Sequence, residues 1–111
     1  MTRLLHTALL LAMIAAVLVS RADASNYTRA HRAICHVFGR YCAQAMRVVR
    51  CETGGTYSVH AQNGQYLGLF QMGTYARSRY GHSHTAIGQA RAAYRYFVAS
   101  GKTWGPWSCK P

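Results

Sequence analysis

The fold of this chain is decided by the stretch VVRCETGG, residues 48–55. It combines the apolar end of a predicted helix with a cysteine, an acidic residue and a glycine pair. The helix is predicted from about Tyr41 to Glu52, and its apolar stripe consists of Cys42, Ala45, Met46 and Val49. Because Glu52 follows Val49 by three residues, it continues that stripe. The glycines end the helix, so Glu52 is predicted at its C-terminus, on the core-facing side.

Glu52 is also one of only two acidic residues, and the other is Asp23. A carboxylate at a helix C-terminus faces the negative end of the helix dipole. Glu52 therefore does not stabilise its helix, although the chain has so few acidic residues. We interpret Glu52 as a functional residue. Glycosidases that hydrolyse their substrate normally use two carboxylates, so the composition argues against that class.

Residues 1–24 are predicted to be a secretory signal peptide. Arg3 supplies the positive charge, an apolar run covers residues 4–19, and residues 22–24 (ADA) have the small-x-small pattern of a cleavage site. The run is shorter than the about 20 apolar residues that a membrane span needs, and an uncleaved anchor is the alternative. We expect residues 25–111 to form one small secreted domain.

The predicted mature domain is strongly basic. Loss of Arg3 and Arg21 with the signal peptide leaves eleven of the thirteen Lys and Arg residues against one Glu, a net charge of +10 with neutral His. Such a charge favours anionic surroundings. Secretion argues against nucleic acid, and the basic residues form no long run. Anionic membranes and anionic cell-wall polymers remain as the expected partners, and the alternative is a solvated surface that binds neither.

Four cysteines remain, and an even number in a short secreted chain predicts two disulfides rather than a zinc site. Cys42 and Cys51 cannot pair, because nine residues of one helix separate them by about 13 Å. Bridged Cα atoms lie within about 7 Å. Gly39 allows the chain to fold back between Cys35 and Cys42. We therefore favour Cys35–Cys42 and Cys51–Cys109, and we expect neither a metal nor a cofactor.

Apolar spacing predicts two further helices. The first covers about residues 30–38, is capped by Asn26 or Thr28 and stops at Gly39. The last is capped by Thr85 and ends at Gly101. Its expected core face consists of Ile87, Ala90, Tyr94, Phe97 and Val98.

Between these helices the turn signal Asn63-Gly64 predicts a small β-hairpin or extended loop within residues 56–69. A short helix is predicted from about Gln71 to Arg79. The fold class is therefore α+β, mainly helical, with a small hairpin and two disulfides.

Three segments carry a family resemblance: VVRCETGG (48–55), NGQYLGLFQM (63–72) and WGPWSC (104–109). Together they resemble the lysozyme-like domain of soluble lytic transglycosylases, most closely the small secreted domains similar to resuscitation-promoting factors. The resemblance covers roughly residues 30–109 and implies a lysozyme-like fold with a hairpin beside the cleft. It also implies a disulfide between the cysteine next to the catalytic Glu and one near the C-terminus, in agreement with Cys51–Cys109.

The resemblance also implies residue roles. The Glu that ends the helix is the family's catalytic acid and corresponds to Glu52, and the glutamine of Gly-Leu-x-Gln lines the sugar cleft and corresponds to Gln71. The Tyr-Asn motif of larger members is absent, and Tyr94 is our candidate for its aromatic role. The other candidate sugar-binding residues are Asn63, Tyr66 and Trp104, each with a structural alternative as a turn or core residue.

The implied activity is cleavage of the β-1,4 bond between N-acetylmuramic acid and N-acetylglucosamine in bacterial peptidoglycan. A lytic transglycosylase needs one Glu, as acid and then as base, and forms a 1,6-anhydro product. The alternatives are a lysozyme-type hydrolase of the same bond and a non-catalytic cationic wall-binding or antimicrobial protein. We expect a monomer that binds glycan strands, and the family also suggests a peptidoglycan endopeptidase as a partner.

Overall fold

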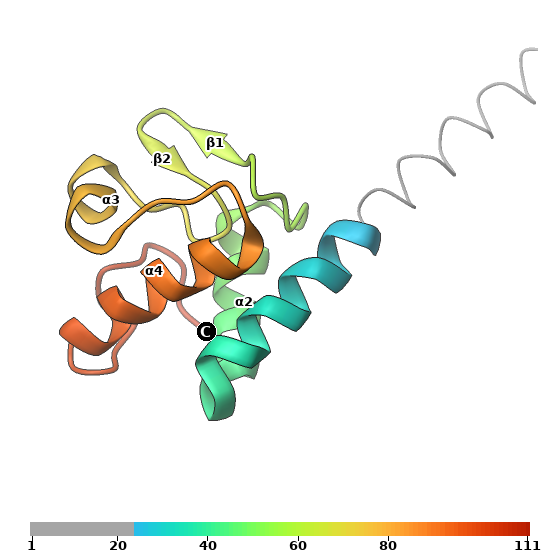
Figure 1. The fold of residues 1–111 in the computed structure, drawn as a ribbon, viewed down its shortest axis with the longest axis horizontal. Helices are drawn as coiled ribbons and strands as arrows, with labels where there is room; N and C mark the ends of the chain where they lie inside the picture. Colours follow the sequence, from blue (N-terminus) through green and yellow to red (C-terminus); the bar gives the residue numbers. More distant parts are fainter. Residues whose placement is uncertain (1–23) are drawn as a thin grey trace, which may run out of the picture.

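A computed structural model describes residues 24–111 of the chain. They form a mainly helical domain with one small antiparallel sheet (Figure 1). Two disulfides cross-link it. The elements are, in order, a helix over residues 24–38, the 3-10 turn η1 (Gly39–Tyr41), α2 (Cys42–Glu52), β1 (Gln62–Asn63), β2 (Tyr66–Leu67), α3 (Thr74–Tyr80), α4 (Ala86–Ala99) and a tail over residues 100–111. The predicted mainly helical class, hairpin and two disulfides are confirmed.

The predicted signal peptide lies outside the described residues, except for Ala24. No helix within residues 24–111 is both long and apolar enough to cross a membrane.

The first helix differs from its prediction at its start. Asn26 and Thr28, the two predicted caps, both lie inside the helix. The Thr28 hydroxyl donates to the Ala24 carbonyl at 3.0 Å, and the Asn26 amide donates to the Thr56 carbonyl at 3.4 Å. The cap prediction was therefore wrong, since both side chains donate to carbonyls instead of accepting from the free N–H groups of a helix start.

The helix ends where it was predicted to end, at Gly39. This residue has a φ of +53°, which glycine adopts without the steric cost that a side chain brings. The reversal leads into α2 and brings Cys35 and Cys42 together, with 4.7 Å between their Cα atoms. The second disulfide, Cys51–Cys109, ties the end of α2 to the tail with a Cα separation of 5.9 Å. Both predicted pairings are confirmed.

The core is aromatic and is centred on Phe38. Its ring stacks on Phe70 and Trp104, with centroids 5.4 and 5.7 Å away, and meets Tyr94 edge-on at 5.2 Å. These contacts join the first helix to α4 and to two irregular segments far apart in sequence. Aromatic pairs in such offset or edge-on geometry stabilise a fold by more than their buried area alone. Phe38 therefore holds the first helix, α4 and the two irregular segments together.

α4 begins after Thr85 as predicted, because the Thr85 hydroxyl accepts a hydrogen bond from the Gly88 N–H at 3.1 Å. The predicted core face was only partly right. Val98 is 44% exposed, whereas Ala92 and Ala93 are buried. Alanine adds little to an apolar pattern, yet its small side chain lets a helix pack closely against its neighbours. The buried face is therefore rotated away from Val98.

Gln89 is a buried polar residue of α4 that holds three segments together. Its side-chain oxygen accepts from the Leu69 N–H at 2.8 Å, and its nitrogen donates to the carbonyls of Val59 and Ser83 at 3.0 and 2.9 Å. Gly68 makes room for this arrangement, since a Cβ there would lie 2.5 Å from the Gln89 oxygen. Gln89 therefore fixes the segment that leads into the candidate site.

Gln89→Leu is expected to lower the free energy of unfolding by about 3 kcal/mol. The change leaves the three partner groups without Gln89, and each buried unsatisfied group costs about 1–3 kcal/mol. Urea unfolding followed by circular dichroism measures the effect. The matched control is Gln62→Leu, which removes only a local bond to the Gly64 carbonyl at an exposed position and should change stability by less than about 0.5 kcal/mol. Equal effects would contradict the role assigned to Gln89.

Candidate active site

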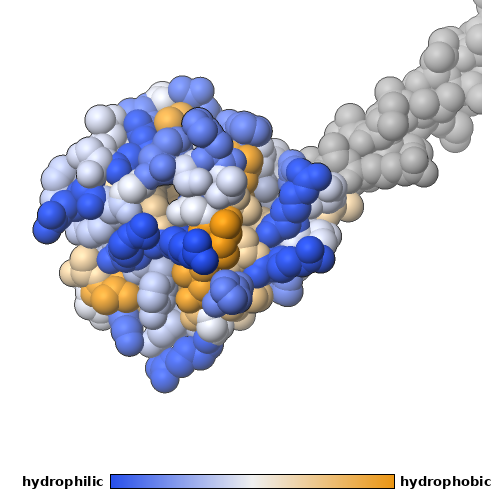
Figure 2. Space-filling view, in the orientation of Figure 1, coloured by the Kyte–Doolittle hydropathy of each residue, from blue (hydrophilic) through white to orange (hydrophobic). Residues whose placement is uncertain are grey.

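An open cavity of about 500 Å³ lies at the C-terminal end of α2. Its walls come from the hairpin, residues 71–76, α4 and residues 106–108 of the tail. Glu52 is the only Asp, Glu, Lys, Arg or His residue among those that line it. The cavity is therefore a polar, aromatic site with one carboxylate, in a domain whose basic residues lie elsewhere. Figure 2 shows one face of this domain, on which hydrophilic residues predominate.

α2 places Glu52 at this cavity. Val48 and Val49 are fully buried and fix the rotation of the helix, so Glu52, three and four residues later, lies on the same face. Its side chain is partly buried. The helix ends directly afterwards through Gly54 and Gly55, which have φ angles of +60° and +82°. The predicted position of Glu52, at the helix C-terminus and facing inward, is confirmed.

The tail, residues 100–111, contacts the Glu52 carboxylate through a backbone hydrogen bond. The Cys109 N–H donates to Glu52 Oε1 at 3.1 Å. This contact depends on the Cys51–Cys109 disulfide, because Cys51 is the residue next to Glu52. The hydrogen bond orients one carboxylate oxygen at a position where the helix dipole disfavours a negative charge.

Gln71 lines the cavity, and its side chain is held firmly. Its amide nitrogen donates to the carbonyls of Ala61 and Gly68 at 2.9 and 3.0 Å. Both amide hydrogens are thus used within the protein, and the side-chain oxygen is left to accept from a ligand. The backbone φ of Gln71 is +44°, a strained value for a residue with a side chain. Such strain is common where a side chain must be presented to a ligand.

The hairpin brings Asn63 and Tyr66 to the same cavity. They are cross-strand partners in its antiparallel register, and the turn between them is Gly64-Gln65. The predicted turn, Asn63-Gly64, was wrong by one residue. Only Gly64 of the two turn residues has a positive φ, +60°, so glycine is needed at the first turn position and Asn63 remains a strand residue.

Two lining tyrosines escaped the sequence analysis. Tyr75 is 71% exposed, although it is a large aromatic residue. Tyr96 stacks on Tyr80 with centroids 4.7 Å apart. Burial raises the pKa of Tyr96 above its ordinary value, and Tyr80 and Tyr75 add to the shift, so its phenol is a neutral hydrogen-bond donor at pH 7. The sequence did carry one signal for Tyr75: it is an aromatic residue on the polar side of a short amphipathic helix.

Tyr94 and Trp104, two of the predicted sugar-binding residues, do not line the cavity. Tyr94 packs edge-on against Phe38, and Trp104 is 7% exposed and donates from its indole nitrogen to Gln44 at 2.8 Å. Tyr96 follows Tyr94 by two residues, which places it about 200° further around α4. Tyr96 therefore faces the cavity and Tyr94 does not. The structure thus brings together Glu52, Gln71, Asn63 and Tyr66, and it assigns the other two to the core.

Comparisons with protein-family models, curated proteins and solved structures found no match for this chain.

Proposed function

We propose that this protein is a secreted lytic transglycosylase with a lysozyme-like fold. Its substrate is the glycan strand of bacterial peptidoglycan, and the bond it cleaves is the β-1,4 bond between N-acetylmuramic acid and N-acetylglucosamine. The proposal combines the family resemblance of three sequence segments with the composition of the cavity. No cofactor is needed for this reaction.

One observation carries the proposal: Glu52 is the only side-chain carboxylate within residues 24–111, and it lines the cavity. Hydrolysis by two carboxylates requires a second acid about 5–9.5 Å away, as nucleophile or as base. The described part of the chain has no residue for that role. A mechanism in which one carboxyl group acts twice fits the available residues.

Glu52 acts first as an acid and then as a base. Its carboxyl proton passes to the glycosidic oxygen as the bond from that oxygen to the anomeric carbon breaks. The 6-hydroxyl of the muramic acid then attacks the anomeric carbon, and the Glu52 carboxylate takes the hydroxyl proton. The product is a 1,6-anhydro sugar, water is not consumed, and Glu52 returns to its starting state.

The remaining lining residues suit a sugar chain. Tyr66 and Tyr75 present exposed rings, onto which the apolar faces of pyranose rings can stack. Gln71 offers its side-chain oxygen to a hydroxyl or acetamido N–H, and Asn63 offers a further amide. The net positive charge of the domain attracts it to anionic wall polymers, an interaction that salt weakens.

Mass spectrometry of purified peptidoglycan, digested by the oxidised domain of residues 25–111, tests the proposal. We expect muropeptides with 1,6-anhydro ends, which lack one water relative to hydrolysis products. Reducing ends would instead identify a hydrolase that uses the substrate's N-acetyl group as nucleophile. Absence of soluble sugar, together with salt-sensitive sedimentation of the protein with peptidoglycan, would favour the cationic wall-binding alternative.

Tyr75→Ala is expected to raise the KM for soluble glycan strands about five- to tenfold and to change kcat little. Removal of one stacking ring costs about 1 kcal/mol of binding, and Tyr75 has no part in proton transfer. Initial rates over a range of glycan concentrations measure both constants. Tyr27→Ala is the matched control, because Tyr27 is 45% exposed but does not line the cavity. A similar KM for both variants would contradict the assignment of Tyr75 to the sugar site.

A further inference from the structure

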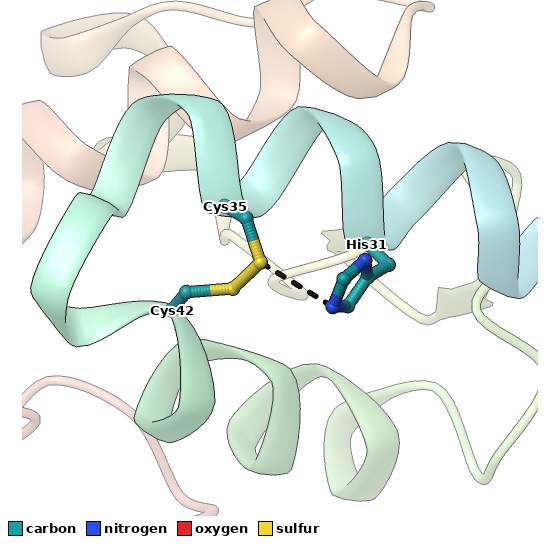
Figure 3. A group of neighbouring side chains, drawn as sticks. All are labelled: His31, Cys35 and Cys42. Atoms are coloured by element: carbon teal, nitrogen blue, oxygen red, sulfur yellow. Dashed lines mark hydrogen bonds between the residues drawn. A yellow bond between two sulfur atoms is a disulfide. The ribbon is translucent and has the colours of Figure 1, made fainter.

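His31, Cys35 and Cys42 form a cluster where the first helix turns back into α2 (Figure 3). None of the three lines the cavity. The His31 ring points at the disulfide, and its Nε2 lies 3.5 Å from the Cys35 Sγ. The candidate ligand atoms of the three residues all lie within 4.8 Å of one another. Within residues 24–111 this is the only such group of three.

The backbone, and not only the disulfide, holds this cluster together. His31 and Cys35 are four residues apart on one helix and therefore share a face. Ile34 and Phe38 anchor that helix in the core, with exposures of 0% and 2%. Cys42 is the first residue of α2, directly after the turn that begins at Gly39. Reduction of the disulfide therefore leaves two thiols and an imidazole near one another.

Two thiolates and one imidazole are a ligand set for thiophilic cations such as Zn²⁺. With Zn–S near 2.3 Å and Zn–N near 2.0 Å, the sulfur and nitrogen ligands of a tetrahedral ion lie about 3.5 Å apart. The observed separation of His31 Nε2 and Cys35 Sγ, 3.5 Å, already matches that distance. The two sulfurs must move from bonding distance to about 3.8 Å apart, which side-chain rotation can provide.

We propose that the Cys35–Cys42 disulfide is a redox-gated metal site. A two-electron reductant, such as a thiol or a phosphine, breaks the S–S bond, and two protons convert the sulfurs into thiols. One Zn²⁺ then binds His31, Cys35 and Cys42, displaces both thiol protons and keeps water in its fourth position. The oxidised form does not bind, because disulfide sulfurs carry no thiolate charge. The inference is independent of the proposed function.

Titration of the full domain with Co²⁺, a spectroscopic substitute for Zn²⁺, tests the site. The protein is first reduced with a phosphine, which does not compete for the ion as a dithiol would. We expect one equivalent to bind with the visible and thiolate charge-transfer absorption of tetrahedral Co²⁺, and Zn²⁺ to displace it. The same protein without reductant should show no such absorption.

Two variants make the test specific. Cys35→Ser/Cys42→Ser should abolish binding, although Cys51 and Cys109 are equally reduced. His31→Ala should weaken binding at least tenfold, whereas His36→Ala, an exposed histidine of the same helix, should leave it unchanged. Equal binding by the two histidine variants would overturn the proposal, and it is the result expected if the reduced chain were unfolded. Binding that survives in the double serine variant would overturn it as well.

Discussion

Glu52→Gln is expected to reduce the release of anhydro-muropeptides at least about 10³-fold, through kcat. General acid–base catalysis contributes about 10²–10⁴-fold in one step, and the proposed mechanism uses the same carboxyl group in both steps. Glutamine has nearly the same shape and keeps a side-chain oxygen for the Cys109 N–H. The substitution therefore removes the proton transfer while it preserves the geometry.

Product release from purified peptidoglycan, measured by liquid chromatography and mass spectrometry, is the readout for this variant. Two controls separate chemistry from folding and binding: the unfolding midpoint and sedimentation with peptidoglycan should both stay close to those of the wild type. A variant that keeps more than a few per cent of the wild-type rate would exclude Glu52 as the acid. A wild type that binds the wall but releases no sugar would support the cationic binding protein instead.

Cys51→Ser/Cys109→Ser is expected to lower the free energy of unfolding by about 4 kcal/mol and to abolish activity. In the chain-entropy model the cost of losing a disulfide grows with the loop that it closes, and these cysteines are 58 residues apart. Small domains have a total stability of only about 5–15 kcal/mol. Release of the tail also removes the Cys109 N–H from Glu52 and Trp107 from the cavity wall.

The matched comparison is Cys35→Ser/Cys42→Ser, whose cysteines are seven residues apart. The same model gives a loss of about 2 kcal/mol, and these residues do not line the cavity. Urea unfolding and product release should be measured for both variants. Equal losses of stability, or an active Cys51→Ser/Cys109→Ser variant, would contradict the role that the structure gives to the tail.

The local features of this fold could be predicted from sequence because short-range physics determines them. Helix periodicity and the glycine stops located α2, and with it the inward-facing position of Glu52. The limited reach of a disulfide excluded a bond between Cys42 and Cys51. The Thr85 cap of α4 is likewise a local hydrogen bond, and its sequence signal was sufficient.

The composition of the cavity could be predicted only in part, because it depends on long-range packing. Apolar spacing cannot tell which face of α4 meets Phe38 and which meets the tail. Tyr94 was therefore chosen where Tyr96 lines the cavity. The same limit applies to Trp104, whose indole nitrogen finds Gln44, sixty residues earlier in the chain. Gln89 gave no signal at all, since its three partners come from separate loops.

All residues that line the cavity lie between Cys51 and Cys109 in the sequence. The disulfide therefore turns the whole candidate site into a covalent macrocycle, while the first helix stays outside the ring. Exposed loops are the preferred places for proteolytic nicking, and the ring contains several. One cut in such a loop opens the ring but releases no fragment, because both new ends remain joined through the disulfide. Glu52 and the opposite cavity wall thus stay in a single molecule after a first cleavage.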